Sequence, residues 1–575
     1  MTGKSTTFEV QVLQDKRWVL AEVAGDEANA VAFADNLLQK GNHQAVRVVR
    51  DFRRMDGLHS ETVIHEKSAD DRKKGDLSVV PVAEAPMCRG PADFYGLSSR
   101  QVIGRIFRRY LDEFTLTPTE LLHNAREMKR LADKDRLLFS AVDCVSTLQA
   151  QASGEDGKAR RDFLHRAWDE AVARARKAEP DKPPAATTPL AELVAAAGGE
   201  DEERAYRCRV LMALCLLETR SWAGKLDRAL AWATEEGAAA EQEVAGEGAP
   251  ARMALVDGVI ADLLMSAQLI QDLMGFQLNL GTALCHMCDL AAGQAEPARF
   301  APEAFGALNR LLAGRVLPQA REILLARVIR ELRGANPLSR NEPGREFEMF
   351  TQLLDRLIPY TGMVGGPAAA EAVAQRHMRL HNVGGATGHA QAVGGMARVL
   401  GDCCRQTHYL LALAASSLSP AVGTMAIEAL AQVGATATGI DAWAPRRLSP
   451  RDRMAALAAC NRAITAAAVL PEGLRADLAN LTDLVMVRYL EDEAVIEKID
   501  RPDDALALRA IRLVKFCGSG VLIPGQSLDR ARRRVIDHLR QPQFEEKFLA
   551  SAGDPAQGER QLREFHRLLV ESGFR

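Results

Sequence analysis

The sequence predicts a mostly α-helical protein, in which a small N-terminal α+β module is followed by a large multi-helix bundle or an irregular α-hairpin array. Near residue 68 the chain changes from alternating apolar and polar residues to long Ala-, Leu-, Arg- and Glu-rich stretches with helical periodicity. Aromatic residues make up only 5% of the 575 residues, which favours helices packed through Leu and Ala over large β-sandwiches. A chain of this length is expected to form about two to four domains.

The first unit, residues 1–67, has the pattern of a ββαββ module. Phe8, Val10 and Val12 alternate with polar residues, which is the period of a half-buried strand. One amphipathic helix packed on four strands makes a stable two-layer arrangement. In chain order we expect strands at 8–14 and 16–23, a helix at 25–41, and strands at 44–52 and 60–67.

Changes of composition divide the rest of the chain. Residues 68–90 are charged and then Pro-containing, so we expect a linker there. A helical domain is predicted at 91–235, and its Pro-rich segment 179–190 predicts an internal linker. After a Gly- and Glu-rich break, a large helical domain is predicted at 253–575.

Two local patterns in the helical body predict particular elements. Thr117, Pro118 and Glu120 have the spacing of a capping box with proline in the first helical position, so a helix should begin there. Residues 253–273 are apolar over more than half of a helical circumference, so we expect one central helix.

Charge and cysteine content limit the classes of function. The net charge of −3 at pH 7 argues against electrostatic binding of nucleic acid by the whole chain. The N-terminus lacks the apolar core of a signal peptide, and no apolar stretch reaches the length of about 18 residues that predicts a transmembrane segment. Most of the ten cysteines lie in apolar helical runs, as small buried residues do in a reducing compartment, so we expect a cytoplasmic protein.

The densest group of possible metal ligands lies at 377–408. His377 and His381 are four residues apart, as are Cys404 and His408, so each pair should share a helix face. Zinc prefers four nitrogen or sulfur donors in a tetrahedral arrangement, and the two pairs together could supply them. The segment lacks the Glu of a metalloprotease helix. The alternative is that these are surface or core residues without a ligand.

Two further patterns favour structure over chemistry. The Gly-rich segments 362–367 and 384–395 do not follow a predicted buried strand, so we expect turns between helices and not phosphate loops. Cys285 and Cys288 share a helix face but should lie in mid-helix, where the dipole does not activate a thiol. We expect both cysteines to pack in the core.

A basic helix is predicted around Arg530, Arg533 and Arg534. Leu528, Ala531, Val535 and Leu539 recur at helical spacing and should face the body, which leaves the three arginines in solvent. This basic helix is a solvated face or a contact surface for an acidic protein, nucleic acid or an anionic membrane.

Another candidate contact surface lies in the N-terminal module. Arg47 alternates with Val46 and Val48, so it should point away from the core if the two valines point inward. An exposed sheet face with arginines is suited to an acidic peptide or an anionic ligand. Trp18 is expected to be either a core anchor or part of this binding face.

No catalytic motif with firm spacing occurs in the chain, whether a nucleophile elbow, a kinase signature or an EF-hand. We therefore expect a non-enzymatic cytoplasmic regulatory or scaffolding protein that binds partner proteins and uses no cofactor. One alternative is a metal-dependent sensor or enzyme that uses the His/Cys cluster at 377–408. A weaker alternative is a nucleic-acid-associated factor that uses the basic C-terminal helix. The sequence does not specify the oligomeric state.

Overall fold

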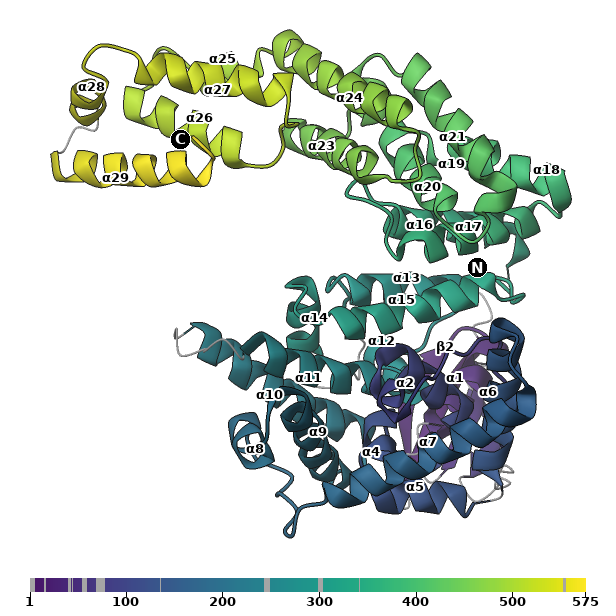
Figure 1. Cartoon of the computed structure of the whole chain (residues 1–575). Coiled ribbons are helices and arrows are strands. Elements are labelled where there is room, and N and C mark those ends of the chain that lie inside the picture. Colours follow the sequence, from purple (N-terminus) through teal and green to yellow (C-terminus); the bar gives the residue numbers. More distant parts are fainter. Residues whose placement is uncertain are drawn as a thin grey trace. The chain divides into compact units, whose positions relative to one another are not determined.

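A computed structural model describes the chain in these ranges: 6–14, 17–39, 43, 45–53, 59–68, 78–134, 136–241, 249–297, 304–340, 342–551 and 555–574. The structure is 69% helical and has one small four-stranded antiparallel sheet near the N-terminus, followed by many helices (Figure 1). The predicted fold class is therefore confirmed. The chain divides into two compact units, Met1–Ala326 and Arg327–Arg575.

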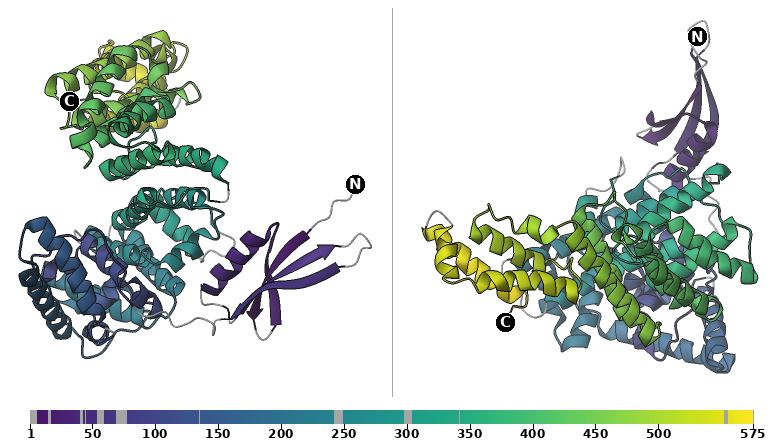
Figure 2. Two further views of the ribbon diagram at one scale, coloured as in Figure 1. Left: turned by 90° about the vertical axis from the view of Figure 1, so that its right-hand side faces the viewer. Right: turned by 90° about the horizontal axis from the view of Figure 1, so that it is seen from above.

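The N-terminal sheet has the strand order β2-β1-β3-β4, and each neighbouring pair is antiparallel. One helix, α1, packs on one face of the sheet (Figure 2). The alternation in β1 places Phe8, Val10 and Val12 in the core beneath α1, together with Val46 and Val48 of β3. The elements are β1 (Thr6–Gln14), β2 (Arg17–Ala24), α1 (Glu27–Gln39), β3 (Ala45–Arg53) and β4 (His59–Ser68).

The helices of the first unit follow a short extended segment. One core cluster of this unit is formed mainly by Leu, Ile, Val, Ala and aromatic side chains of α2 to α7. In order, the helices are η2 (Pro91–Tyr95), α2 (Leu97–Ile106), α3 (Arg108–Glu113), α4 (Pro118–Leu122), α5 (Ala125–Ala132), α6 (Leu137–Ser153), α7 (Gly157–Lys177), α8 (Leu190–Ala197), α9 (Asp201–Leu217), α10 (Trp222–Glu241), α11 (Ala249–Leu263), α12 (Ala267–Met274), α13 (Leu280–Ala291), α14 (Phe305–Ala313) and α15 (Pro318–Arg333).

Two local predictions are confirmed in this unit. The Thr117 side chain caps α4 by accepting a hydrogen bond from the Glu120 amide, and the Glu120 carboxylate accepts one from the Thr117 amide at 2.8 Å. Cys285 and Cys288 lie within α13, away from its first turn, and both are buried and form no disulfide bond. The capping box and the buried cysteines are thus local features that the sequence pattern predicts well.

The prediction of one helix over 253–273 is wrong. The helix breaks after Leu263, and α12 begins at Ala267 with Ser266 as its N-cap. The Ser266 side chain is fully buried and accepts a hydrogen bond from the Leu269 amide at 3.4 Å, which satisfies a free donor of the new helix. Apolar periodicity continues across the break and therefore hides it.

No single helix in the described ranges is long and apolar enough to cross a membrane. By length and composition alone, one bent pair of helices meets that test: Pro250–Leu263 and Ala267–Met274, which meet at 92°.

Both predicted linkers have described parts that are held against helices. Residues 78–90 have neither helix nor strand, yet Val82 and Cys88 are buried in the core of the neighbouring helices. Within 179–190, the Thr188 carbonyl accepts a hydrogen bond from the Trp232 indole at 3.2 Å. Residues 69–77 of the first linker lie outside the described ranges.

The predicted domain limits remain predictions. The division into two units falls after Ala326, within α15, which therefore belongs to both units, and inside the predicted domain 253–575. The predicted limits at 67 and 235 do not coincide with this division.

Consecutive helices of the second unit pack in pairs, among them α20 with α21, α23 with α24, and α26 with α27 (Figure 1). This arrangement fits the irregular hairpin array predicted from sequence. In order, the helices are η3 (Pro343–Arg345), α16 (Glu346–Leu357), α17 (Gly366–Leu380), α18 (Gly385–Ala390), η4 (Gln391–Gly395), α19 (Met396–Leu400), α20 (Cys403–Ala414), α21 (Ser419–Thr436), α22 (Ile440–Trp443), α23 (Pro450–Ala466), α24 (Glu472–Asp492), α25 (Val495–Ile499), α26 (Leu506–Gly518), α27 (Gln526–Leu539), α28 (Phe544–Ala550) and α29 (Pro555–Glu571).

The Gly-rich segment 384–395, predicted as a turn, is helical instead. It forms α18 and then η4, which is a π-helix. Glycine disfavours a helix but does not forbid one when packing is dense. A Cβ atom at Gly395 would come within 2.8 Å of Cε1 of His377, so close packing against α17 accounts for glycine at this position.

Candidate functional site

The four residues predicted as zinc ligands lie on two helices. His377 in α17 and His381 at its end have ring centroids 4.5 Å apart, whereas Cys404 and His408 lie on α20. A hydrogen bond with Cys460 of α23, together with burial, raises the pKa of Cys404 well above its ordinary value. Across the described ranges, no group of three or more His, Cys, Asp or Glu side chains is placed to hold a metal ion. The four residues are therefore not gathered into a zinc site there.

The contacts of His377 and His408 are those of core residues. The His408 Nε2 atom lies 3.2 Å from the Tyr360 carbonyl oxygen, and burial lowers the pKa of His408. Burial also lowers the pKa of His377 to about 4, with a smaller effect from the neighbouring His381. Both His377 and His408 are consequently neutral at pH 7.

The predicted basic helix is α27. Ala531 and Val535 are buried, as the helical spacing predicts, and Leu528 is half-buried, but Leu539 at the end of the helix is 36% exposed, so the prediction is wrong for that residue. The Arg533 side chain is exposed. Arg530 is also exposed but forms an ion pair with Glu491 of α24. The role of these arginines in binding a partner remains a prediction.

Arg534 belongs to a buried ion-pair cluster centred on Asp500, which is 1% exposed. The Asp500 carboxylate accepts hydrogen bonds from Arg509 Nε at 2.7 Å, from His538 Nε2 at 2.8 Å, and from Arg534 Nε. Burial would raise the pKa of Asp500, but the three hydrogen bonds outweigh it and hold the pKa below its usual value. Arg534 therefore has a structural contact that its position in a basic run did not reveal.

Trp18 and Arg47 lie together on the face of the N-terminal sheet that is opposite α1, here called the outer sheet face. The Arg47 guanidinium lies 4.5 Å from the centroid of the Trp18 ring, and its Nε donates to Gln11 Oε1 at 2.8 Å. Gln11 in turn donates to Glu9 at 3.0 Å. The structure thus places both predicted residues on one surface.

Strand register identifies the other members of the outer sheet face. Leu20 of β2 lies opposite Gln11, which lies opposite Arg47. A second row crosses the sheet in the same way, from Val23 through Glu9 and Val49 to Val63. Directly opposed residues share a face, so apolar side chains of both edge strands flank the Trp18–Arg47 contact.

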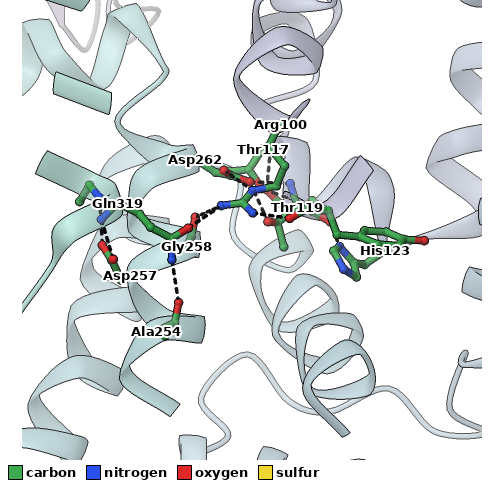
Figure 3. A network of polar contacts seen from close by, with 12 residues as sticks. Arg100, Thr117, Thr119, His123, Ala254, Asp257, Gly258, Asp262 and Gln319 are labelled. Atoms are coloured by element: carbon green, nitrogen blue, oxygen red, sulfur yellow. Dashed lines mark hydrogen bonds and ion pairs between the residues drawn. The ribbon is translucent and has the colours of Figure 1, made fainter. Parts of the chain in front are cut away.

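A buried polar network that the sequence reasoning missed connects α2, α4 and α11 (Figure 3). Asp262 is fully buried and accepts hydrogen bonds from Arg100 Nε at 2.8 Å and from the Thr119 amide and hydroxyl at 2.8 and 2.7 Å. Arg100 also donates to Gln319 Oε1 at 3.2 Å. A second buried pair lies beside it, where Lys225 Nζ is 2.5 Å from Glu120 Oε1.

Three aromatic rings next to this network form a compact cluster. The centroids of Tyr95, His123 and Tyr206 are 5.0 to 5.1 Å apart. His123 Nδ1 lies 2.8 Å from the Thr119 carbonyl oxygen. The other ring nitrogen of His123 and both tyrosine hydroxyl groups are buried and have no hydrogen-bond partner among the described residues.

One sequence signal could have pointed to the network. Asp257 and Asp262 interrupt the apolar run "LVDGVIADLL", and a carboxylate in such a run must be exposed or paired. The partners of Asp262 are distant in sequence, because Thr119 lies 143 residues and Arg100 162 residues before it. No local motif can therefore contain them.

Comparisons of the chain with models of protein families, with curated proteins and with solved structures find no match. Function is therefore argued from the chain's own residues.

We predict that changing Lys225 to Met destabilises the first unit by about 3–5 kcal/mol at pH 7.5, because it leaves Glu120 buried without its cation. Burial already raises the pKa of Glu120. A buried carboxyl with a raised pKa makes the folded protein less stable as the pH rises and the carboxyl ionises. The loss of stability in the variant should therefore shrink as the pH is lowered towards the ordinary pKa of glutamate, near 4.3. Thermal denaturation at several pH values measures both effects.

The matched control is the double variant Lys225→Met with Glu120→Gln. A glutamine in place of Glu120 would keep an oxygen for the Thr117 amide but carry no charge, so most of the lost stability should return. If the double variant is as unstable as Lys225→Met alone, the loss comes from packing and not from an unpaired charge.

We also predict that Arg534→Glu and Arg533→Glu differ in their effects on stability. Arg534→Glu places a carboxylate beside Asp500 and should lower the free energy of unfolding by about 1–3 kcal/mol, a value discounted because Arg534 is 44% exposed. Arg533→Glu should change it by less than about 0.5 kcal/mol. Equal melting temperatures for the two variants would show that the Asp500 cluster does not depend on Arg534.

Proposed function

We propose that this protein is a non-enzymatic regulatory or scaffolding protein that binds partner proteins, and that the outer sheet face is one of its docking surfaces. The observation that carries the proposal is the exposure of apolar side chains on that face. Leu20 is 51% exposed, Val23 47% and Val63 46%. Leu20 and Val23 lie on one edge strand and Val63 on the other, whereas Val49 between the edges is only 3% exposed. Exposed apolar side chains at the edges of a sheet favour an interaction surface.

The polar centre of the outer sheet face suggests which partner fits it. The Arg47 Nε atom donates to Gln11, and the flat face of its guanidinium lies over the Trp18 ring. The remaining donors of its guanidinium point to no hydrogen-bond acceptor among the described residues, and a carboxylate would match their geometry. The proposed partner segment therefore carries apolar side chains on either side of an Asp or Glu.

The helical body supports the same class of function. Its consecutive helices pack in pairs, and grooves between packed helices commonly accept peptide segments. None of the ten cysteines forms a disulfide bond, which is usual in a reducing compartment and supports a cytoplasmic location.

The two alternatives have less support. The His/Cys cluster does not form a ligand group among the described residues, which weakens the proposal of a metal-dependent sensor or enzyme. In the basic helix, Glu491 and Asp500 already engage Arg530 and Arg534, so fewer free cations remain for nucleic-acid phosphates.

A photo-crosslinking residue placed at position 20 tests the proposal, with position 570 as the control because Val570 is 75% exposed on the last helix. We predict that position 20 captures a specific protein, whose purified form then binds the full chain. Leu20→Asp and Arg47→Glu should each weaken that binding at least tenfold, whereas Val570→Asp should not. A partner whose affinity is unchanged by both variants of the sheet face would contradict the proposed docking surface.

A further inference from the structure

Beyond protein docking, we propose that the second unit binds a small neutral molecule in a cavity between α20 and α23. The molecule is mostly apolar and carries one O–H or N–H donor, for which His408 is the acceptor. The cavity has a volume of about 390 Å³, which is in the size range of small-molecule sites. It lies wholly within the second unit, so the proposal does not depend on the outer sheet face.

Small side chains on two neighbouring helices leave the space for this ligand. The helices α20 and α23 pack against each other (Figure 1). Ala412 and Ala415 line the cavity from the side of α20, and Ala463 and Ala466 line it from the side of α23. Alanine side chains at these four positions fill less of the space between the helices than larger residues would.

The lining of the cavity favours a neutral ligand. Among the described residues, no Asp, Glu, Lys or Arg side chain lines it. An ion withdrawn from water into such surroundings would have no partner of opposite charge, which is costly. The apolar body of a neutral molecule would instead contact the alanines, together with Leu411, Met363 and Val469.

One buried side chain of the cavity has a polar atom that is not used. His408 lines the cavity and is 3% exposed. Its Nε2 atom lies 3.2 Å from the Tyr360 carbonyl oxygen, which can only accept, so Nε2 carries the proton and Nδ1 has a free lone pair. Nδ1 takes part in no hydrogen bond within the part of the chain that the structure describes. Unlike the unpaired Nδ1 of His377, it is not sealed from solvent.

The unused nitrogen determines which polar group the ligand carries. Burial lowers the pKa of His408, so the ring is neutral at pH 7.5 and Nδ1 is an acceptor. An O–H or N–H group would donate to this atom, whereas an ether or carbonyl oxygen would meet its lone pair with another lone pair. His408, Ala412 and Ala415 are spaced by four and three residues, so the acceptor and the apolar wall share one face of α20.

The cavity can be entered without unfolding of the helices. Three of its lining residues, Thr361, Ala415 and Ala466, are exposed. Thr361 lies in the loop before α17, and Ala466 is the last residue of α23. A small molecule therefore reaches the cavity from solvent between this loop and the two helices.

Titration of the full chain with indole and with benzofuran, followed by ligand-observed NMR at pH 7.5, tests the site. The two probes have nearly the same shape, but benzofuran has an ether oxygen where indole has its N–H group. We expect saturable binding of indole and at least tenfold weaker binding of benzofuran, because only indole can donate to Nδ1. His408→Phe, which has no acceptor, should bind the two probes about equally.

A second variant tests the cavity without changing His408. Ala412→Leu should weaken indole binding at least tenfold, because the larger side chain occupies space one helical turn from His408 and removes no hydrogen bond. Ala429→Leu is the matched control, since Ala429 is half-buried on α21 and does not line the cavity. Its affinity for indole should equal that of the wild type.

Two results would overturn the proposal in different ways. Equal affinities of indole and benzofuran for the wild-type chain would show that His408 Nδ1 does not accept a hydrogen bond from the ligand. Absence of saturable indole binding, or unchanged binding by a folded Ala412→Leu variant, would show that the cavity between α20 and α23 is not the site.

Discussion

The carboxylate of Asp262 is the constraint on which the structure of the first unit depends. It is completely buried, and it accepts hydrogen bonds from a guanidinium, a backbone amide and a hydroxyl. A buried carboxylate is tolerated only when its charge is paired and its lone pairs are used. Because the partners lie on α2 and α4, satisfying this one group fixes three helices relative to each other.

The network around Asp262 also positions the aromatic cluster. Arg100, which pairs with Asp262, donates through another nitrogen to the Tyr95 carbonyl at 2.6 Å and so holds the end of η2. Thr119 donates hydrogen bonds to Asp262 from its amide and its hydroxyl. Its carbonyl oxygen is the hydrogen-bond partner of His123 Nδ1. The backbone of Tyr95 and the ring of His123 are thereby connected through hydrogen bonds to one carboxylate.

Patterns of short range were predictable from the sequence. Alternation in β1 and β3 predicted the sheet with its core face, and the Thr117 capping box predicted the start of α4, because each depends on neighbours within a few residues. The break at Ser266 was missed because apolar residues continue through it. The helical conformation of 384–395 was missed because close packing overrides the low helix propensity of glycine.

The candidate sites were predictable only in part, because a shared helix face does not determine what lies opposite it. The spacing of His377 with His381, and of Cys404 with His408, is real, but each pair faces different neighbours. Trp18 and Arg47 do meet, since strand alternation fixes the face on which each one lies.

Hydrogen exchange of the Asp262→Asn variant tests the central role of this carboxylate most directly. The account predicts faster exchange of the α4 amides and of η2 than in wild type, with residues 327–575 unchanged, because the charge that binds Arg100 is lost. Asp201→Asn, on the exposed start of α9, should leave exchange in α4 and η2 as in wild type. Unaltered protection of α4 and η2 in Asp262→Asn would contradict the account, because those elements would then be held by packing alone.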